Sequence, residues 1–182
     1  MKYLKKYNLF KEGYDINDTD KPDVKLAKEE SNELEKNLKD FPSIKTDLDK
    51  AFNDTKDDKD NSNLNGKIEN IEKKFPNNPF LKKWVEICKL NREVSDIQNT
   101  NTEDKLKLDD FQEELKLSTD SETKLLVNTK IQDIKNRMAK KSQQIVDKLK
   151  KIEELKVNNK KDMDDIRNKM SQNIKDIQKE IS

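Results

Sequence analysis

The chain has 182 residues, of which only 30% are hydrophobic and 42% are charged, so any hydrophobic core must be thin. Its 39 basic and 38 acidic residues are interspersed and leave a net charge of +1, which argues against a polyanion-binding tail. Histidine is absent and Cys88 is the only cysteine, which argues against an enzyme, a transition-metal site and an internal disulfide.

One segment, NSNLNGKIENIE at 61–72, has the spacing of a metal site and resembles an EF-hand calcium loop. Asn61, Asn63 and Asn65 stand at the first three ligand positions, and Glu72 stands at the last. Three neutral amides bind calcium weakly, so we expect an Asn-Gly turn before a helix instead. Apart from this segment we find no motif for a catalytic residue, a cofactor or a metal ion, and we expect no such site.

The first part of the chain predicts two helices after a flexible lead-in. Residues 1–20 are expected to be mobile, and a helical bundle domain is expected over 21–182. Pro22 suits a first helical position, and Pro42 is expected to end that helix before another begins. Residues 53–66 contain a single apolar residue, which predicts a mobile loop.

The middle of the chain predicts a short helix and then a longer one. Pro76 is expected to end the short helix in a sharp corner, and Pro79 to open the longer one. Trp84 belongs to the richest apolar face of the chain, so we expect it in the core. NTNT at 99–102 and STDS at 118–121 supply loop and capping residues, and they predict two further junctions.

No glycine or proline occurs after residue 79, and apolar residues then recur at spacings of three and four. One heptad-like seam has Ile131, Met138, Ile145 and Ile152 at every seventh residue, with Ile134, Leu149 and Leu155 at the intervening spacings. A second seam has Met163, Met170 and Ile177, joined by Ile166, Ile174 and Ile181. VNNKKD at 157–162 separates them, and we expect a hairpin turn there rather than one rod of roughly 90 Å. The sequence predicts an all-α, elongated antiparallel bundle with coiled-coil-like C-terminal helices.

The C-terminal helices are mildly basic, with 16 basic and 10 acidic residues over 121–182. Paired lysines recur there, but a ten-residue step turns each pair away from the previous one, and acidic residues lie between them. We therefore expect no nucleic-acid site. The candidates for contact with an acidic partner are Lys140, Lys141, Lys150 and Lys151. A solvated helix face is the alternative interpretation.

The stretch KDDKDNSNLNGKIENIEKKFPNNPFLKKW at 56–84 is dense in Lys, Asn, Asp and Ile. In this texture the chain resembles the hydrophilic domain of the immunodominant membrane proteins of phytoplasmas, wall-less bacteria of plants and sap-feeding insects. The resemblance implies a domain displayed on the cell surface, with a membrane anchor outside this chain, that binds a host protein such as actin. It contains no motif and assigns no residue. The alternative is a cytoplasmic coiled-coil scaffold or assembly protein, and a homo-oligomer fits either.

Overall fold

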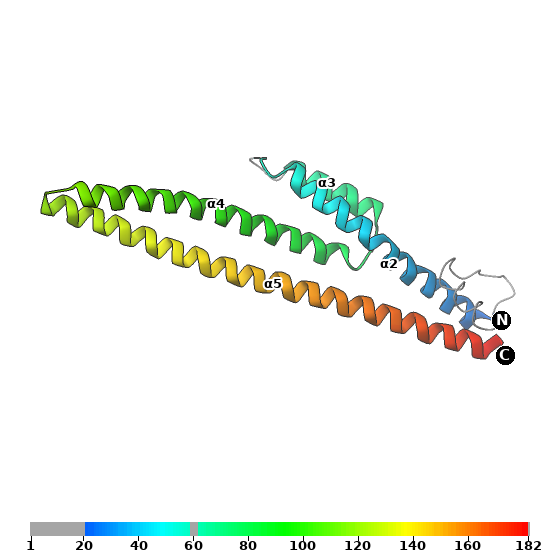
Figure 1. Ribbon diagram of the computed structural model, residues 1–182. Helices are drawn as coiled ribbons and strands as arrows, with labels where there is room; N and C mark the ends of the chain where they lie inside the picture. Colours follow the sequence, from blue (N-terminus) through cyan, green and yellow to red (C-terminus); the bar gives the residue numbers. More distant parts are fainter. Residues whose placement is uncertain (1–20, 59–61, 182) are drawn as a thin grey trace, which may run out of the picture. The chain divides into compact units, whose positions relative to one another are not determined.

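The computed structural model describes residues 21–58 and 62–181, and the expected lead-in at 1–20 lies outside them. The described residues form four helices and no strand: α2 (Pro22–Asp54), α3 (Ser62–Lys74), α4 (Leu81–Leu117) and α5 (Ser121–Ile181), as Figure 1 shows. The prediction of an all-α fold is confirmed.

The chain divides into two compact units, which are described separately. Unit 1 comprises Met1–Val85 and Lys156–Ser182, so it holds α2, α3, the first turn of α4 and the end of α5. Unit 2 is Glu86–Leu155 and holds most of α4 and the first part of α5.

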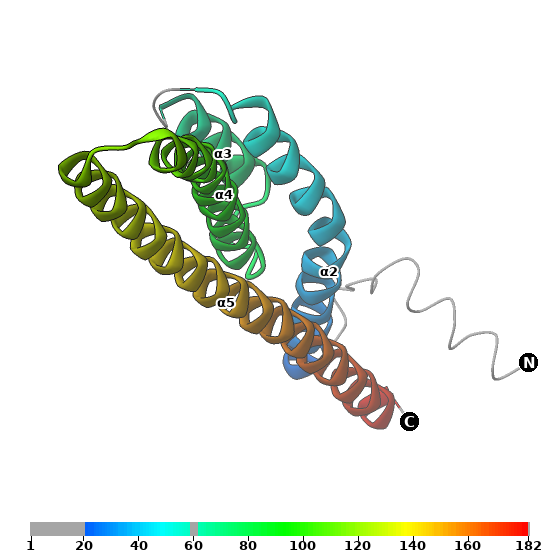
Figure 2. The same ribbon diagram turned by 60° about the vertical axis from the view of Figure 1, so that its left-hand side comes forward.

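In unit 1, α3 packs antiparallel to the C-terminal half of α2 (Figures 1 and 2). The apolar stripe of each helix is buried, with Ile44, Leu48, Ala51 and Phe52 on α2 and Leu64, Ile68 and Ile71 on α3. Ion pairs flank this core, joining Lys74 to Asp47 at 2.7 Å and Lys67 to Asp54 at 2.9 Å. The opposite chain directions follow from these pairs, because higher residue numbers on α3 meet lower ones on α2.

The corner between α3 and α4 is held by asparagine. Asn77 has φ of 62°, a left-handed conformation that asparagine tolerates better than most residues. The Asn78 side chain donates a hydrogen bond to the Asn37 carbonyl and accepts one from the Phe80 N–H. Phe80 is fully buried, and its ring lies 5.1 Å from that of Phe41. The predicted corner after Pro76 is confirmed.

The start of α2 and the end of α5 also belong to unit 1. Lys169 forms an ion pair with Glu30 at 2.5 Å, and Asn173 donates hydrogen bonds to Glu30 and Ser31. These bonds, first the one from Lys169, lower the pKa of Glu30. Ser31 is fully buried. The buried apolar residues of this end of α5 are Met170, Ile174 and Ile177, part of the second predicted seam.

Unit 2 is an antiparallel hairpin of two helices, joined at 118–120 (Figure 1). From 124 to 155 on α5, every residue that is not exposed falls on one run of alternating three- and four-residue steps: Val127, Ile131, Ile134, Met138, Lys141, Ile145, Lys148, Ile152 and Leu155. On α4 the corresponding run is Ile87, Leu90, Val94, Ile97, Asn101, Asp104, Leu108, Phe111 and Leu115. This periodicity is that of a two-helix coiled coil. Leu149, which was predicted in the seam, lies outside the run and is 48% exposed, because Lys148 takes the seam position.

Pro42 does not end the first helix, contrary to the prediction. It lies inside α2, where it lacks an N–H for the helical ladder. Thr46 donates its hydroxyl to the Pro42 carbonyl at 3.0 Å. The residues after Pro42 include Ile44 and Leu48, which are fully buried in the core of unit 1. Burial of this second half offsets the cost of one interrupted turn.

Two other predicted breaks are also helical. Residues 99–102 lie within α4, and residues 157–162 lie within α5, so the hairpin turn predicted there is wrong. Asparagine and threonine are only modestly unfavourable in a helix, and seam residues on both sides outweigh them. The expected loop at 53–66 is also shorter, because α2 continues to Asp54 and α3 begins at Ser62. Residues 59–61 lie outside the described part.

Candidate partner-binding surface on unit 2

A polar layer interrupts the apolar seam of unit 2. The carboxylate of Asp104 accepts hydrogen bonds from Lys141 at 2.7 Å and from Arg137 at 3.1 Å. Lys141 also donates to the Thr100 carbonyl at 3.2 Å. Asp104 is 5% exposed, and the bond from Lys141 is the main cause that lowers its pKa. Lys141 therefore lies in the seam and not on the outer face, where the sequence had suggested a partner would meet it.

Lys151 also pairs within the hairpin. Its ammonium lies 2.5 Å from the Glu86 carboxylate, and this hydrogen bond raises the pKa of Lys151. Lys148, one turn earlier, forms an ion pair with Glu93. Both pairs join α4 to α5 along the same flank of the seam. Sequence reasoning missed Lys148, although its spacing from Ile145 and Ile152 already placed it on the seam.

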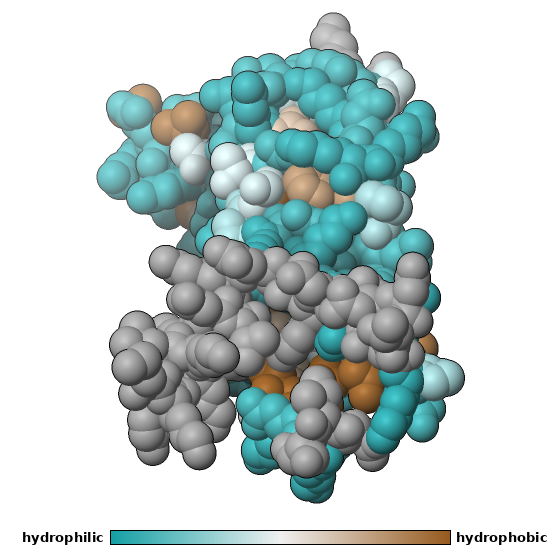
Figure 3. All heavy atoms as spheres, turned by 90° about the vertical axis from the view of Figure 1, so that its right-hand side faces the viewer, coloured by the Kyte–Doolittle hydropathy of each residue, from teal (hydrophilic) through white to brown (hydrophobic). Residues whose placement is uncertain are grey.

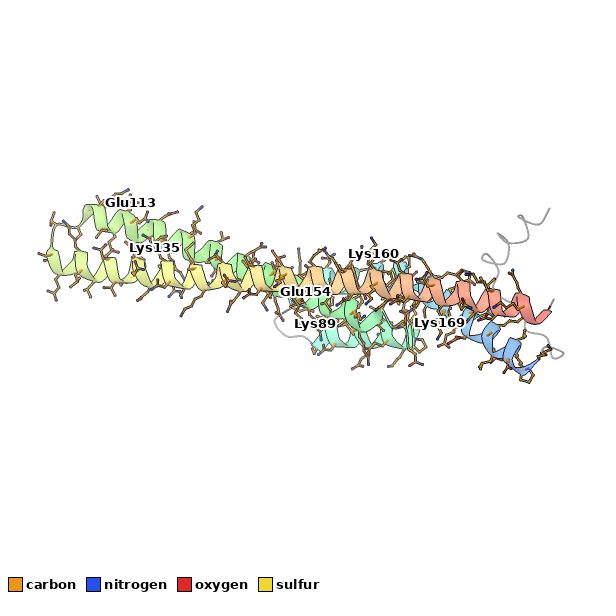
Figure 4. All side chains as sticks on the ribbon, turned by 90° about the horizontal axis from the view of Figure 1, so that it is seen from below. Lys89, Glu113, Lys135, Glu154, Lys160 and Lys169 are labelled. Carbon is orange, nitrogen blue, oxygen red and sulfur yellow. The ribbon has the colours of Figure 1, made fainter. Side chains whose placement is uncertain are left out.

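Lys140 and Lys150 are exposed, and neither has an ion pair among the described residues. They occupy positions of the coiled coil that point away from α4. Their side chains can therefore reach a partner without disturbing the hairpin. Of the four predicted contact lysines, these two lie on the outer face. Figure 4 shows that charged side chains of both signs follow one another along the helices, including the labelled Glu113, Lys135 and Glu154.

Three exposed leucines flank the loop of the hairpin. Leu117 ends α4 and is 76% exposed, while Leu125 and Leu126 in the first turns of α5 are 69% and 59% exposed. All three fall off the seam spacing, so the hairpin does not bury them. Sequence reasoning did not single them out, although their proximity to the STDS junction was a usable signal.

The loop itself is ordered by capping, which fixes where these leucines lie. Asp120 accepts a hydrogen bond from the Thr123 N–H at 2.7 Å, and this bond is the main cause that lowers the Asp120 pKa. The Ser118 N–H donates to the Glu114 carbonyl at 3.0 Å and closes the end of α4. The predicted junction at 118–121 is confirmed.

The calcium-loop segment has a different structure from either interpretation of its sequence. Asn63, Asn65 and Glu72 lie within α3, so their side chains cannot converge as loop ligands, and the Asn-Gly pair is helical instead of a turn. Asn61 lies outside the described residues. The Asn63 amide donates to Asp58 at 2.9 Å. Among the residues that the structure describes, no group of three or more His, Cys, Asp or Glu side chains could hold a metal ion.

On the face seen in Figure 3 the described residues are mainly hydrophilic, and hydrophobic residues form only small patches. No helix in the described part of the chain is long and apolar enough to cross a membrane. No family model, curated protein or solved structure matches the chain.

Proposed function

We propose that this chain is a non-catalytic helical binding module that recognises a macromolecular partner through the hairpin of unit 2. The observation that carries the proposal is the set of exposed leucines, Leu117, Leu125 and Leu126, beside one capped loop. Single exposed leucines are common on proteins, but several together, rimmed by charge, are typical of a protein-binding surface.

The charge of the hairpin indicates what kind of partner fits. The α5 arm, residues 121–155, carries nine basic and five acidic residues, a net charge of +4. Lys140 and Lys150 add exposed ammonium groups to this arm. An acidic protein surface would therefore be attracted, with the charges raising the association rate and the leucines providing the desolvated contact.

The resemblance to the immunodominant membrane proteins of phytoplasmas suggests display on the cell surface and a host protein as partner, and actin, whose surface is acidic, is the first candidate. A cytoplasmic scaffold is the alternative, and the continuous heptad pattern of unit 2 favours it if no host protein binds.

The test is co-sedimentation of the full chain with actin filaments at low and raised ionic strength. We expect binding that weakens with salt, because the contacts of exposed lysines are screened. The double variant Leu117→Ser, Leu126→Ser should lose at least about tenfold in affinity. The matched control is Leu106→Ser, because Leu106 is 62% exposed but lies on α4 away from the loop.

The lysines are tested separately with Lys140→Glu and Lys150→Glu together, which leave the internal pairs of Lys141 and Lys151 intact. This variant should bind more weakly and with a smaller salt dependence. If the intact chain does not sediment with filaments at low salt, actin is excluded as the partner. If the leucine variant binds as well as its control, the surface beside the loop is not the binding site.

A further inference from the structure

The two flanks of the hairpin in unit 2 differ in charge. The Glu86–Lys151 ion pair crosses one flank, and these residues immediately precede the seam residues Ile87 and Ile152. The residues that directly precede Ile87 and Ile152, and their equivalents every seven residues along each helix, therefore share this flank. The exposed residues on the other side of the seam must share the opposite flank.

The opposite flank carries no charge over its middle section. Its exposed residues there, which we name the uncharged face, are Ser95, Gln98 and Thr102 on α4 and Ala139, Ser142, Val146 and Leu149 on α5. Val146 is 58% and Leu149 is 48% exposed. In a chain that is 42% charged, a continuous helical face without charge is unusual. Towards the loop the face ends at Lys105 and Lys135, the second of which Figure 4 labels.

The seam behind this face is only partly covered. Ile97, Leu108, Met138 and Ile145 are seam residues, yet each remains half-buried. Two helices bury little apolar surface by themselves, whereas four helices enclose a complete core. A second helical pair laid on the uncharged face would cover the face and those edges of the seam residues that border it.

The charges of the two arms identify the second pair. Residues 86–117 of α4 carry five basic and nine acidic residues, a net charge of −4, against the +4 of residues 121–155 on α5. A second copy of the same hairpin offers the complementary arm to each. We propose that the uncharged face of unit 2 is the interface of a homodimer, in which α4 of one copy packs on α5 of the other to form a four-helix bundle.

The proposal also fixes the direction of the second copy. A twofold axis parallel to the hairpin places α4 opposite α5 of the partner copy and sets both loops at the same end, whereas a perpendicular axis would place the two acidic arms together. Glu93 and Lys148 are paired and so lie at one level of the hairpin. Two residues nearer the loop on each helix, Ser95 and Val146 share a level as well, and they would face each other across the interface.

The first test measures the molar mass of the full chain by light scattering over a range of concentrations. We expect twice the chain mass of 21.5 kDa. Val146→Lys should weaken the dimer at least about tenfold, because it would bury an unpaired charge. The matched control is Gln144→Lys, which makes the same change of charge at an exposed position on the charged flank. Circular dichroism should show equal helix content for both variants.

The second test determines the arrangement by disulfide formation. Ser95→Cys and Val146→Cys chains are mixed and oxidised mildly, and the mixture should cross-link more than either chain alone. The unchanged chain is the control, because its single Cys88 is buried. Cross-linking that is no stronger in the mixture than in the single variants would overturn the proposed arrangement.

A monomeric mass at every concentration would overturn the proposal. Equal dimer stability of the Val146→Lys and Gln144→Lys variants would overturn it as well. The measurements need no actin or other partner, so their outcome is independent of the proposed binding function.

Discussion

Asp104 of α4 and Lys141 of α5 are joined at 2.7 Å within the mainly apolar seam of the coiled coil. A charged pair at such a position contributes little net stability, because both groups lose water. It does favour one register, since sliding either helix by a turn would leave a charge in the seam without its partner. The pair therefore links the sequence of each helix to the alignment of the hairpin.

Changing Lys141 to Glu should destabilise the hairpin, because it removes a donor from Asp104 and places a second carboxylate beside it. We expect a loss of about 1–3 kcal/mol. Lys140→Glu makes the same change of charge one residue away at an exposed position and should stay within about 0.5 kcal/mol. Thermal melting by circular dichroism measures both. Equal melting temperatures would show that Lys141 is not held in the seam.

The pH dependence of stability follows from the lowered pKa of Asp104, with an ordinary value of 3.8. A carboxyl group whose pKa is lower in the folded state stabilises the protein fully above its unfolded value and loses this contribution as pH falls through its folded value. The melting temperature should therefore decrease as the pH is lowered below about 4. Asp104→Asn should be less stable at pH 7, and its melting temperature should decrease less on acidification. Melting curves recorded at pH 7 and below pH 4 measure both effects. A variant that keeps the full decrease would assign the effect to other carboxylates, such as Glu30.

The sequence predicted those parts of the fold in which local and distant interactions agree. Ile131 and Ile152 show the seven-residue repeat of the seam, and both are buried. The stops around Pro76 and at 118–121 are real because backbone geometry and capping end a helix there, whatever packs nearby. Pro42 and residues 99–102 were misread because their local preference is outweighed by packing on both sides, which the local pattern does not show.

The candidate surface was predictable only in part, for a related reason. Lys140 and Lys141 are adjacent and chemically identical, yet Lys140 is exposed and Lys141 pairs with Asp104. Lys141 lies seven residues after Ile134 and four before Ile145, which is the spacing of the seam, and Lys140 does not. This spacing distinguishes the half-buried lysine from the exposed one. The exposure of Leu125 and Leu126 depends on where α4 ends, so it required the hairpin geometry.

Phe80 is the residue on which the aromatic cluster of unit 1 depends. It is fully buried, and Phe41 contacts both Phe80 and Trp84, with ring centroids at 5.1 and 5.6 Å. Phe80→Ala should cost about 3–5 kcal/mol, because the cavity removes aromatic contacts that small shifts cannot restore. Leu26→Ala is the control, since Leu26 is 65% exposed and should change stability by about 0.5 kcal/mol or less. Urea unfolding followed by tryptophan fluorescence compares them, and an equal midpoint for both variants would contradict the assigned core.

Asn158 tests whether α5 is continuous where the sequence favoured a turn. It is exposed and helical, so Asn158→Pro would remove a ladder hydrogen bond and clash with the preceding turn, at a cost of about 3 kcal/mol. Asn158→Ala removes the same amide without constraining the backbone, and it should be neutral or slightly stabilising. In a hairpin turn the order would reverse, because proline is common in turns and alanine is not. Melting temperatures of the two variants therefore distinguish a helix from a turn, and a proline variant as stable as the alanine variant would show that α5 breaks at this point.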